Sequence, residues 1–128
     1  MILLDHNINK SQAEQLRRFR IHFRQIGYDV GRPEWDDQQE ILRYLHRVKQ
    51  PTFFTWDRGL FRQHLCHPNY CIVVIVGPVL ETARLIRKFL RHPQFKTKAQ
   101  RQGKVVELSQ AGITWWEFSR IHQQQLNW

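Results

Sequence analysis

The chain has 128 residues, of which 41% are hydrophobic and 24% are charged. This length and composition indicate one globular domain with a core of its own, and they exclude an intrinsically disordered chain. The formal net charge of +9 favours a polyanionic partner, above all nucleic acid, although part of such a charge is typical of any solvated helix face.

The elements of the first half are predicted from apolar periodicity and from capping residues. In chain order they are a strand at 2–4, a helix at 11–26, a strand at 28–30, a helix that starts at Asp36 or Asp37, and a strand at 52–55. Ser11 and Glu14 form a capping-box pattern at the start of the first helix, and Gly27 is expected to end it. Pro51 prevents the second helix from continuing.

The second half begins with an uninterrupted apolar strand. In chain order its elements are helical turns at 59–64, a strand at 71–76, a helix at 78–91, a mobile basic loop at 95–103, a strand at 105–108, a short edge strand at 113–118 and a tail at 119–128. We therefore expect a single domain over residues 1–118 and a C-terminal tail over 119–128.

No targeting or membrane segment is expected. The first apolar residues run directly into Asp5 without a basic leader, and the apolar run at 72–76 is far shorter than a membrane span. These features predict a cytoplasmic chain that makes no contact with a membrane. Cys66 and Cys71 lie near His64 and His67, but their spacing is less regular than that of structural zinc sites, so free cysteines are the favoured interpretation.

Alternation of strands and helices predicts an α/β fold of three layers, α/β/α, around a central, mainly parallel sheet. In such a fold the carboxyl ends of the strands meet at one edge, where ligands bind. Asp5 and Asp57 each follow a predicted strand, so the fold alone is expected to bring both carboxylates to this edge.

Further acidic residues lie at the start of the second helix. Asp37 and Glu40 are three residues apart and can point in the same direction. Several carboxylates at one edge are suited to Mg²⁺ or Mn²⁺, which can activate water beside a phosphodiester. Each residue also has an ordinary structural explanation, because Asp37 and Asp57 can cap helices and Glu40 can be a solvated helix residue.

The acidic segments resemble those of compact PIN-like nucleases, including VapC-type toxins. Residues 1–8 (MILLDHNI) resemble the family's opening motif, residues 37–45 its acidic middle helix, and residues 53–58 (FFTWDR) its third motif. The resemblance covers roughly the first ninety residues. The sequence departs from the family at His6, where Glu is common, and at Gly59, where a second Asp is common.

The resemblance implies a metal-dependent endoribonuclease that is the toxin of a bacterial toxin–antitoxin pair. It assigns catalysis to Asp5, Asp37, Glu40 and Asp57, and metal binding to Asp5 and Asp57. The partners it implies are RNA and a cognate antitoxin, with a homodimer as a further alternative. Because Gly59 removes a carboxylate, a non-catalytic PIN-like module that binds nucleic acid or a protein is the competing hypothesis.

Basic residues are expected to hold the RNA backbone around these carboxylates. The candidates are Arg58, Arg62, Lys96, Lys98, Arg101 and Lys104. A receiver domain of the response-regulator type also needs acidic residues at strand ends. That alternative is disfavoured because the sequence has neither an adjacent acidic pair after the first strand nor a suitable lysine after a late strand.

Overall fold

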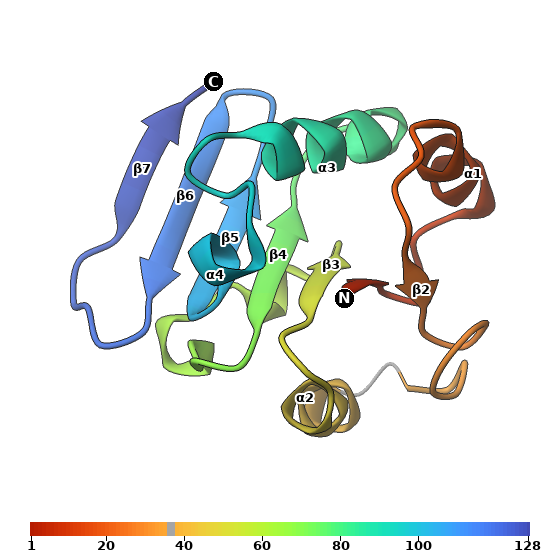
Figure 1. Ribbon diagram of the computed structural model, residues 1–128, viewed down its shortest axis with the longest axis horizontal. Helices are drawn as coiled ribbons and strands as arrows, with labels where there is room; N and C mark the ends of the chain where they lie inside the picture. Colours follow the sequence, from red (N-terminus) through yellow and green to blue (C-terminus); the bar gives the residue numbers. More distant parts are fainter. Residues whose placement is uncertain (36–37) are drawn as a thin grey trace.

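A computed structural model describes residues 1–35 and 38–128, and its strands form one sheet in the order β2-β1-β3-β4-β5-β6-β7 (Figure 1). The strands are β1 (Ile2–Leu4), β2 (Arg24–Gln25), β3 (Thr52–Thr55), β4 (Cys71–Ile75), β5 (Lys104–Leu108), β6 (Gly112–Glu117) and β7 (Gln124–Asn127). The helices are α1 (Lys10–Arg18), α2 (Gln38–Arg47), α3 (Thr82–Arg91) and α4 (Lys98–Arg101), with short 3-10 turns η1 (Arg58–Leu60), η2 (Gln63–Leu65) and η3 (Val79–Glu81).

The fold is α/β, as predicted, but the sheet is mixed rather than mainly parallel. Strands β2, β1, β3, β4 and β5 pair in parallel, whereas β6 and β7 are antiparallel to their neighbours. The reason is the length of the last connections: residues 109–111 and 118–123 are too few for a crossover and instead make hairpins. The predicted tail at 119–128 therefore contains a strand, and β6 is not an edge strand.

The N-terminal elements are shorter than the apolar periodicity predicts. Helix α1 ends at Arg18, and Arg20 follows with a positive φ of 61° that breaks the helix. The apolar residues that follow α1, Phe19, Ile21 and Phe23, pack against the core without belonging to the helix. The second strand is consequently β2 at residues 24–25, and Val30 forms only an isolated bridge with Ile26.

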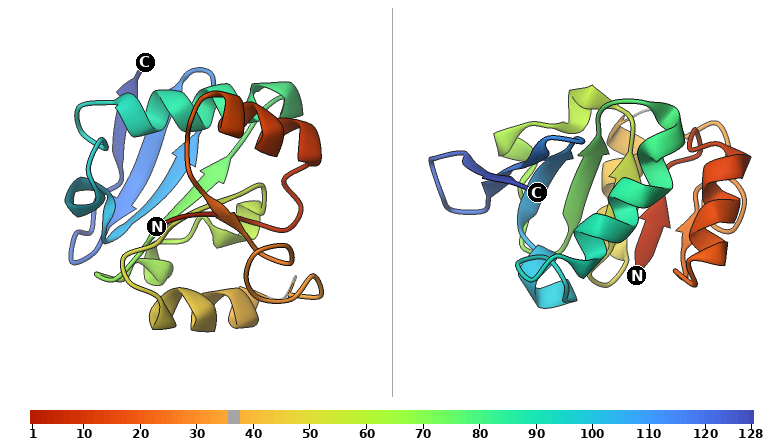
Figure 2. Two further views of the ribbon diagram at one scale, coloured as in Figure 1. Left: turned by 45° about the vertical axis from the view of Figure 1, so that its right-hand side comes forward. Right: turned by 90° about the horizontal axis from the view of Figure 1, so that it is seen from above.

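The central strands are buried on both faces, which explains their continuous apolar character. Phe54 and Val73 belong to a core cluster that includes residues of α1 and α3, while Phe53 and Ile72 belong to a second cluster that includes residues of α2. Figure 2 shows α2 well separated from α1 and α3. The described helices include none that is long and apolar enough to cross a membrane.

The basic segment at 95–103 is ordered, contrary to its prediction as a mobile loop. Thr97 caps the short helix α4 with a capping box, and Arg101 is only 5% exposed. The Arg101 guanidinium donates hydrogen bonds to Thr52 Oγ1 at 2.9 Å and to the Phe95 carbonyl at 3.0 Å. Thr52 is the first residue of β3, so these bonds hold α4 at the amino-terminal ends of the parallel strands.

Candidate functional site

The carboxyl ends of β1 and β3 bring Asp5 and Asp57 together through the hydroxyl of Thr55. The Asp5 amide donates to the Phe54 carbonyl, which extends the parallel pairing of β1 with β3 by one residue. Thr55 Oγ1 donates to Asp5 Oδ2 at 2.6 Å and accepts from the Asp57 amide at 3.0 Å. Asp5 and Asp57 therefore lie at the same end of the parallel strands, as expected, and are linked through Thr55 and the Asp57 amide. We call Asp5, Thr55 and Asp57 the acidic rim.

The Asp5 carboxylate is buried, with 7% of the residue exposed. Burial raises the pKa of Asp5, and the nearby charge of Asp57 raises it further. Hydrogen bonds from Thr55 and from the His6 amide, the latter at 2.7 Å, lower the pKa in part. Among residues 1–35 and 38–128, no basic side chain forms an ion pair with Asp5 or Asp57. The nearby His6 lowers the pKa of Asp5 by a smaller amount and forms no ion pair with it among these residues.

Asp57 has a structural role as well as a place in the rim. Its Oδ1 accepts a hydrogen bond from the Gly59 amide at 2.9 Å and caps the turn η1, as the ordinary structural explanation predicts. Its Oδ2 accepts a hydrogen bond from Gln38 Nε2 at 3.1 Å. Because Gln38 begins α2, this bond ties that helix to the rim.

Gly59 lies beside the amide that contacts Asp57. A Cβ atom built at Gly59 would lie 2.6 Å from Gln38 Nε2 and 3.0 Å from Asp57 Oδ1. Any side chain at this position must therefore displace Gln38. In this chain a neutral amide occupies the space that a carboxylate at position 59 would approach.

The remaining predicted acidic residues do not join the rim in the described part of the chain. Glu40 forms an ion pair with Arg43 at 3.5 Å on a solvated face of α2, which is the ordinary explanation for a helix glutamate. Asp37 lies outside the described residues. The part of the chain that the structure describes contains no group of three or more His, Cys, Asp and Glu residues placed to hold a metal ion.

Some of the predicted basic residues lie at the carboxyl ends of the parallel strands, and the others lie at the amino-terminal ends. Arg58 and Arg62 belong to the segment that follows Asp57, and Arg62 Nε donates to the Gly59 carbonyl at 3.0 Å. The segment at 96–104 lies at the amino-terminal ends of the parallel strands, and β5 runs from it toward the end of the sheet that carries the rim. The prediction that Arg101 holds the RNA backbone is wrong, because Arg101 is a buried structural residue.

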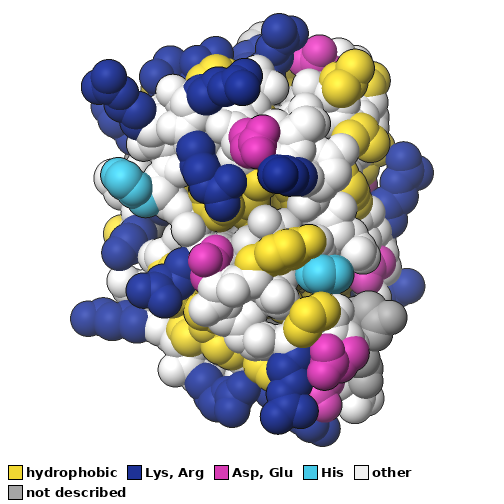
Figure 3. All heavy atoms as spheres, turned by 90° about the vertical axis from the view of Figure 1, so that its right-hand side faces the viewer, with side chains coloured by type: hydrophobic (Ala, Val, Ile, Leu, Met, Phe, Trp, Pro, Cys, Tyr) yellow, Lys and Arg dark blue, Asp and Glu magenta, His cyan; other side chains and the backbone are white. Residues whose placement is uncertain are grey.

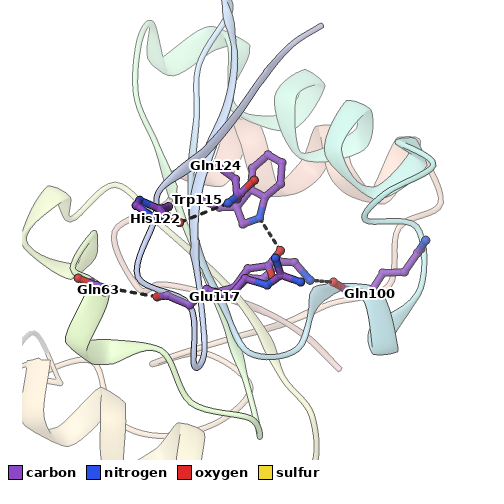
Figure 4. Close-up of polar contacts among 8 residues, drawn as sticks. Gln63, Gln100, Trp115, Glu117, His122 and Gln124 are labelled. Carbon is purple, nitrogen blue, oxygen red and sulfur yellow. Dashed lines mark hydrogen bonds and ion pairs between the residues drawn. The ribbon is translucent and has the colours of Figure 1, made fainter.

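Lys104 also makes a local contact rather than one with the rim. Its ammonium donates to the carbonyl of Gln100 in α4. Figure 4 shows this contact beside Glu117 of β6, whose carboxylate accepts from Trp115 Nε1 at 3.0 Å. The same view shows Gln63 of η2 reaching the turn between β6 and β7, where it donates to the Arg120 carbonyl at 3.1 Å. The Gln63 contact ties the β6–β7 turn to η2, whereas the other two contacts are local.

His6 and Tyr28 lie next to the rim but do not add a ligand to it. Their rings are stacked with centroids 5.3 Å apart, and His6 Nδ1 is buried and has no hydrogen-bond partner among residues 1–35 and 38–128. A Cβ at Gly27 would lie 2.6 Å from this nitrogen, so the ring faces the turn after β2. Figure 3 shows the side of the molecule that carries α1 and β2, where basic side chains are spread widely and acidic ones are scattered.

Thr55 and Gln38 are parts of the site that the sequence did not predict. Thr55 could have been found, because a hydroxyl at a buried strand end between two acidic residues must donate to one of them. Gln38 gives no such signal, since its contact depends on how α2 packs against η1.

The two carboxylates and the Thr55 hydroxyl are hard oxygen donors, which suit Mg²⁺ or Mn²⁺. Each carboxylate oxygen described above accepts one hydrogen bond and keeps a second lone pair. Among the described residues the rim therefore offers oxygen donors of the kind that a hard divalent cation prefers, with fewer carboxylates than the sequence resemblance implies.

Comparison of the chain with protein-family models, with curated proteins and with solved structures gave no match.

Replacing Thr55 with valine is expected to destabilise the fold by about 1–3 kcal/mol, because an isosteric apolar side chain removes the hydrogen bond to Oδ2 of the buried Asp5 carboxylate. The pKa of Asp5 is expected to rise further, since the Thr55 hydrogen bond lowers it. Urea unfolding and NMR titration of the Asp5 carboxyl measure the two effects. Thr55→Ser keeps the hydroxyl, so a serine variant with the same rise in pKa would contradict this explanation.

Proposed function

We propose that this chain is a PIN-like protein of three α/β/α layers that cleaves RNA with Mg²⁺ or Mn²⁺ at the acidic rim. The observation that carries the proposal is the pair of buried or half-buried carboxylates at adjacent parallel strand ends, without a described cationic partner. Burying such charge is costly unless a cation compensates it. A divalent cation is the simplest ligand that removes this cost.

Each rim residue has a distinct part in this function. Asp5 and Asp57 would hold the ion, and Thr55 keeps the Asp5 carboxylate oriented through its hydrogen bond. Arg58 is exposed on η1, directly after Asp57, where its guanidinium can bind a phosphate of the RNA backbone. The chemistry that a bound divalent cation supplies at such a site is activation of water and stabilisation of the leaving oxygen. A toxin paired with an antitoxin is the biological setting that the sequence resemblance favours.

A second candidate is a non-catalytic module that binds RNA or a protein partner. It is favoured by one observation: the Gln38 amide contacts Asp57 beside Gly59, where a further carboxylate would otherwise approach. With fewer carboxylates the ion is held more weakly, and the charge available for catalysis falls.

Manganese is expected to raise the melting temperature of the protein, because an ion that binds only the folded state stabilises it by mass action. The measurement compares melting curves in Mn²⁺ and in chelator, together with cleavage of a labelled RNA under both conditions. Stabilisation accompanied by cleavage supports the nuclease. Stabilisation without cleavage supports the non-catalytic module. The absence of both stabilisation and cleavage would contradict a metal site at the rim.

A further inference from the structure

A hollow lined mainly by basic side chains lies along α3 rather than at the acidic rim. It is lined by Arg84, Arg87, Lys88, Arg91, His92 and Trp128, which we call the α3 groove. Arg87, Lys88 and Arg91 are three, four and seven residues after Arg84, so the four cations share one face of the helix. The opposite face of α3 is buried in the core. The groove is thus built from the outer face of a firmly packed helix.

Positive charge in the α3 groove is largely without acidic partners. Glu81 pairs with Arg84 at 3.4 Å, and the described residues provide no ion pair for Arg87, Lys88 or Arg91. The Arg87 guanidinium lies over the Phe19 ring at 3.7 Å, which orients it without neutralising it. Several adjacent cations of this kind repel one another unless an anion binds between them.

An aromatic ring forms one wall of the groove. Trp128 Nε1 donates to the Ser109 carbonyl at 2.6 Å, which fixes the indole beside α3. Lys88 Nζ lies 4.5 Å from the centroid of this ring, and the His92 ring lies at 6.1 Å. A line of cations next to a fixed indole is the arrangement with which proteins bind single-stranded nucleic acid, the cations holding phosphates and the ring stacking on a base.

We propose that the α3 groove is a binding site for single-stranded RNA. The choice of RNA rests on the proposed function and on the position of α3, whose first residue lies near the rim: Trp56, which precedes Asp57, donates from Nε1 to Thr82 Oγ1. From there α3 crosses the sheet toward the C-terminal end of β7 (Figure 1). Arg84 and Arg91 are separated by about 10 Å along the helix, which is enough for more than one phosphate. An RNA chain that extends from the rim is therefore held along α3.

Nucleic acid fits these residues better than an acidic peptide does. The guanidinium groups match phosphate oxygens in a fork geometry, and the indole offers a surface for a base that a run of Asp or Glu side chains would not use. The aromatic wall is thus the feature that separates the two classes of partner.

The test measures binding of a fluorescein-labelled oligouridine of about ten nucleotides in chelator, where no metal-dependent cleavage takes place. The variant Arg84→Gln/Lys88→Gln/Arg91→Gln is expected to bind at least tenfold more weakly at low salt. Its plot of log affinity against log salt is expected to be shallower by about 2, since each lost phosphate contact removes roughly 0.7 from the slope. The control variant Arg43→Gln/Arg47→Gln/Lys49→Gln removes equal charge from the exposed face of α2 and its end and should leave the slope unchanged.

The aromatic wall is tested separately with Trp128→Leu, which is expected to weaken binding about fivefold or more, and with Trp128→Phe, which keeps a ring and should retain most of the affinity. Equal effects of the α3 and α2 triple variants would overturn the proposal, as would competition by polyglutamate as effective as that by unlabelled oligouridine. Failure of the groove leaves manganese binding at the rim unaffected, whereas failure of the nuclease leaves this binding in chelator intact.

Discussion

Asp5→Asn is expected to abolish divalent-dependent cleavage of RNA while leaving the protein folded. The amide keeps the size of the carboxylate and can still accept the hydrogen bond from the His6 amide. It loses the charge that holds a hard cation, so stabilisation by Mn²⁺ should disappear together with cleavage. Cleavage of a labelled RNA and melting curves with and without Mn²⁺ measure both effects on the same preparation.

A matched control for Asp5→Asn is Asp29→Asn, which also removes one carboxylate, but from the turn after β2, where Asp29 accepts from the Gln25 amide. This variant should keep both cleavage and the response to Mn²⁺. Cleavage that survives Asp5→Asn and chelator alike would refute the proposed role of the rim, because neither the carboxylate nor a metal ion would then be needed.

The pH dependence of stability gives a readout of Asp5 that does not depend on cleavage. The pKa of Asp5 is raised above its ordinary value of 3.8, so the folded protein binds this proton more tightly than the unfolded chain does. In chelator, stability is therefore highest below pH 3.8 with respect to this group, and it falls as pH rises from there through the folded pKa. Asp5→Asn removes this loss, so the variant should gain stability relative to the native protein as pH rises through the same interval.

The position of the rim could be predicted because it depends on features that are local in the sequence. A short apolar run that ends in an acidic residue marks a buried strand end, and parallel pairing brings such ends together. Asp5 and Asp57 are both of this kind, and the structure joins them through Thr55. Neither inference required knowledge of how the helices pack.

The parts that could not be predicted depend on contacts between distant segments. Gln38 reaches Asp57 only because of the position of α2, and the apolar residues after α1 continue a helical pattern although Arg20 ends the helix. Strand β7 forms a hairpin with β6 because the connection is short, whereas its polar sequence resembles a tail. The local periodicity of apolar residues does not predict any of these contacts.

Arg101 is the clearest case in which composition suggests the wrong role. It belongs to a segment that also contains Lys96, Lys98 and Lys104, and this density of charge predicted a flexible surface for RNA. Instead, Arg101 is buried and donates to Thr52 Oγ1 and to the Phe95 and Lys96 carbonyls. Burial lowers the pKa of its guanidinium. An arginine that satisfies three acceptors in the interior links α4 to the start of β3.

Arg101→Met is therefore expected to destabilise the protein by about 2 kcal/mol. The unpaired acceptors that it leaves cost more than is recovered by no longer burying a charge.

The matched control is Lys98→Met, which removes an exposed cation from the same helix and should change stability by no more than about 0.5 kcal/mol. Urea unfolding gives both values, and oligouridine binding is measured at a temperature where both variants are folded. Because Arg101 is buried and does not line the α3 groove, its loss should leave the salt dependence of binding unchanged. If Arg101→Met kept full stability and instead flattened that salt dependence, Arg101 would be a phosphate ligand, and the hydrogen bonds to Thr52 and Phe95 would not be what holds α4 in place.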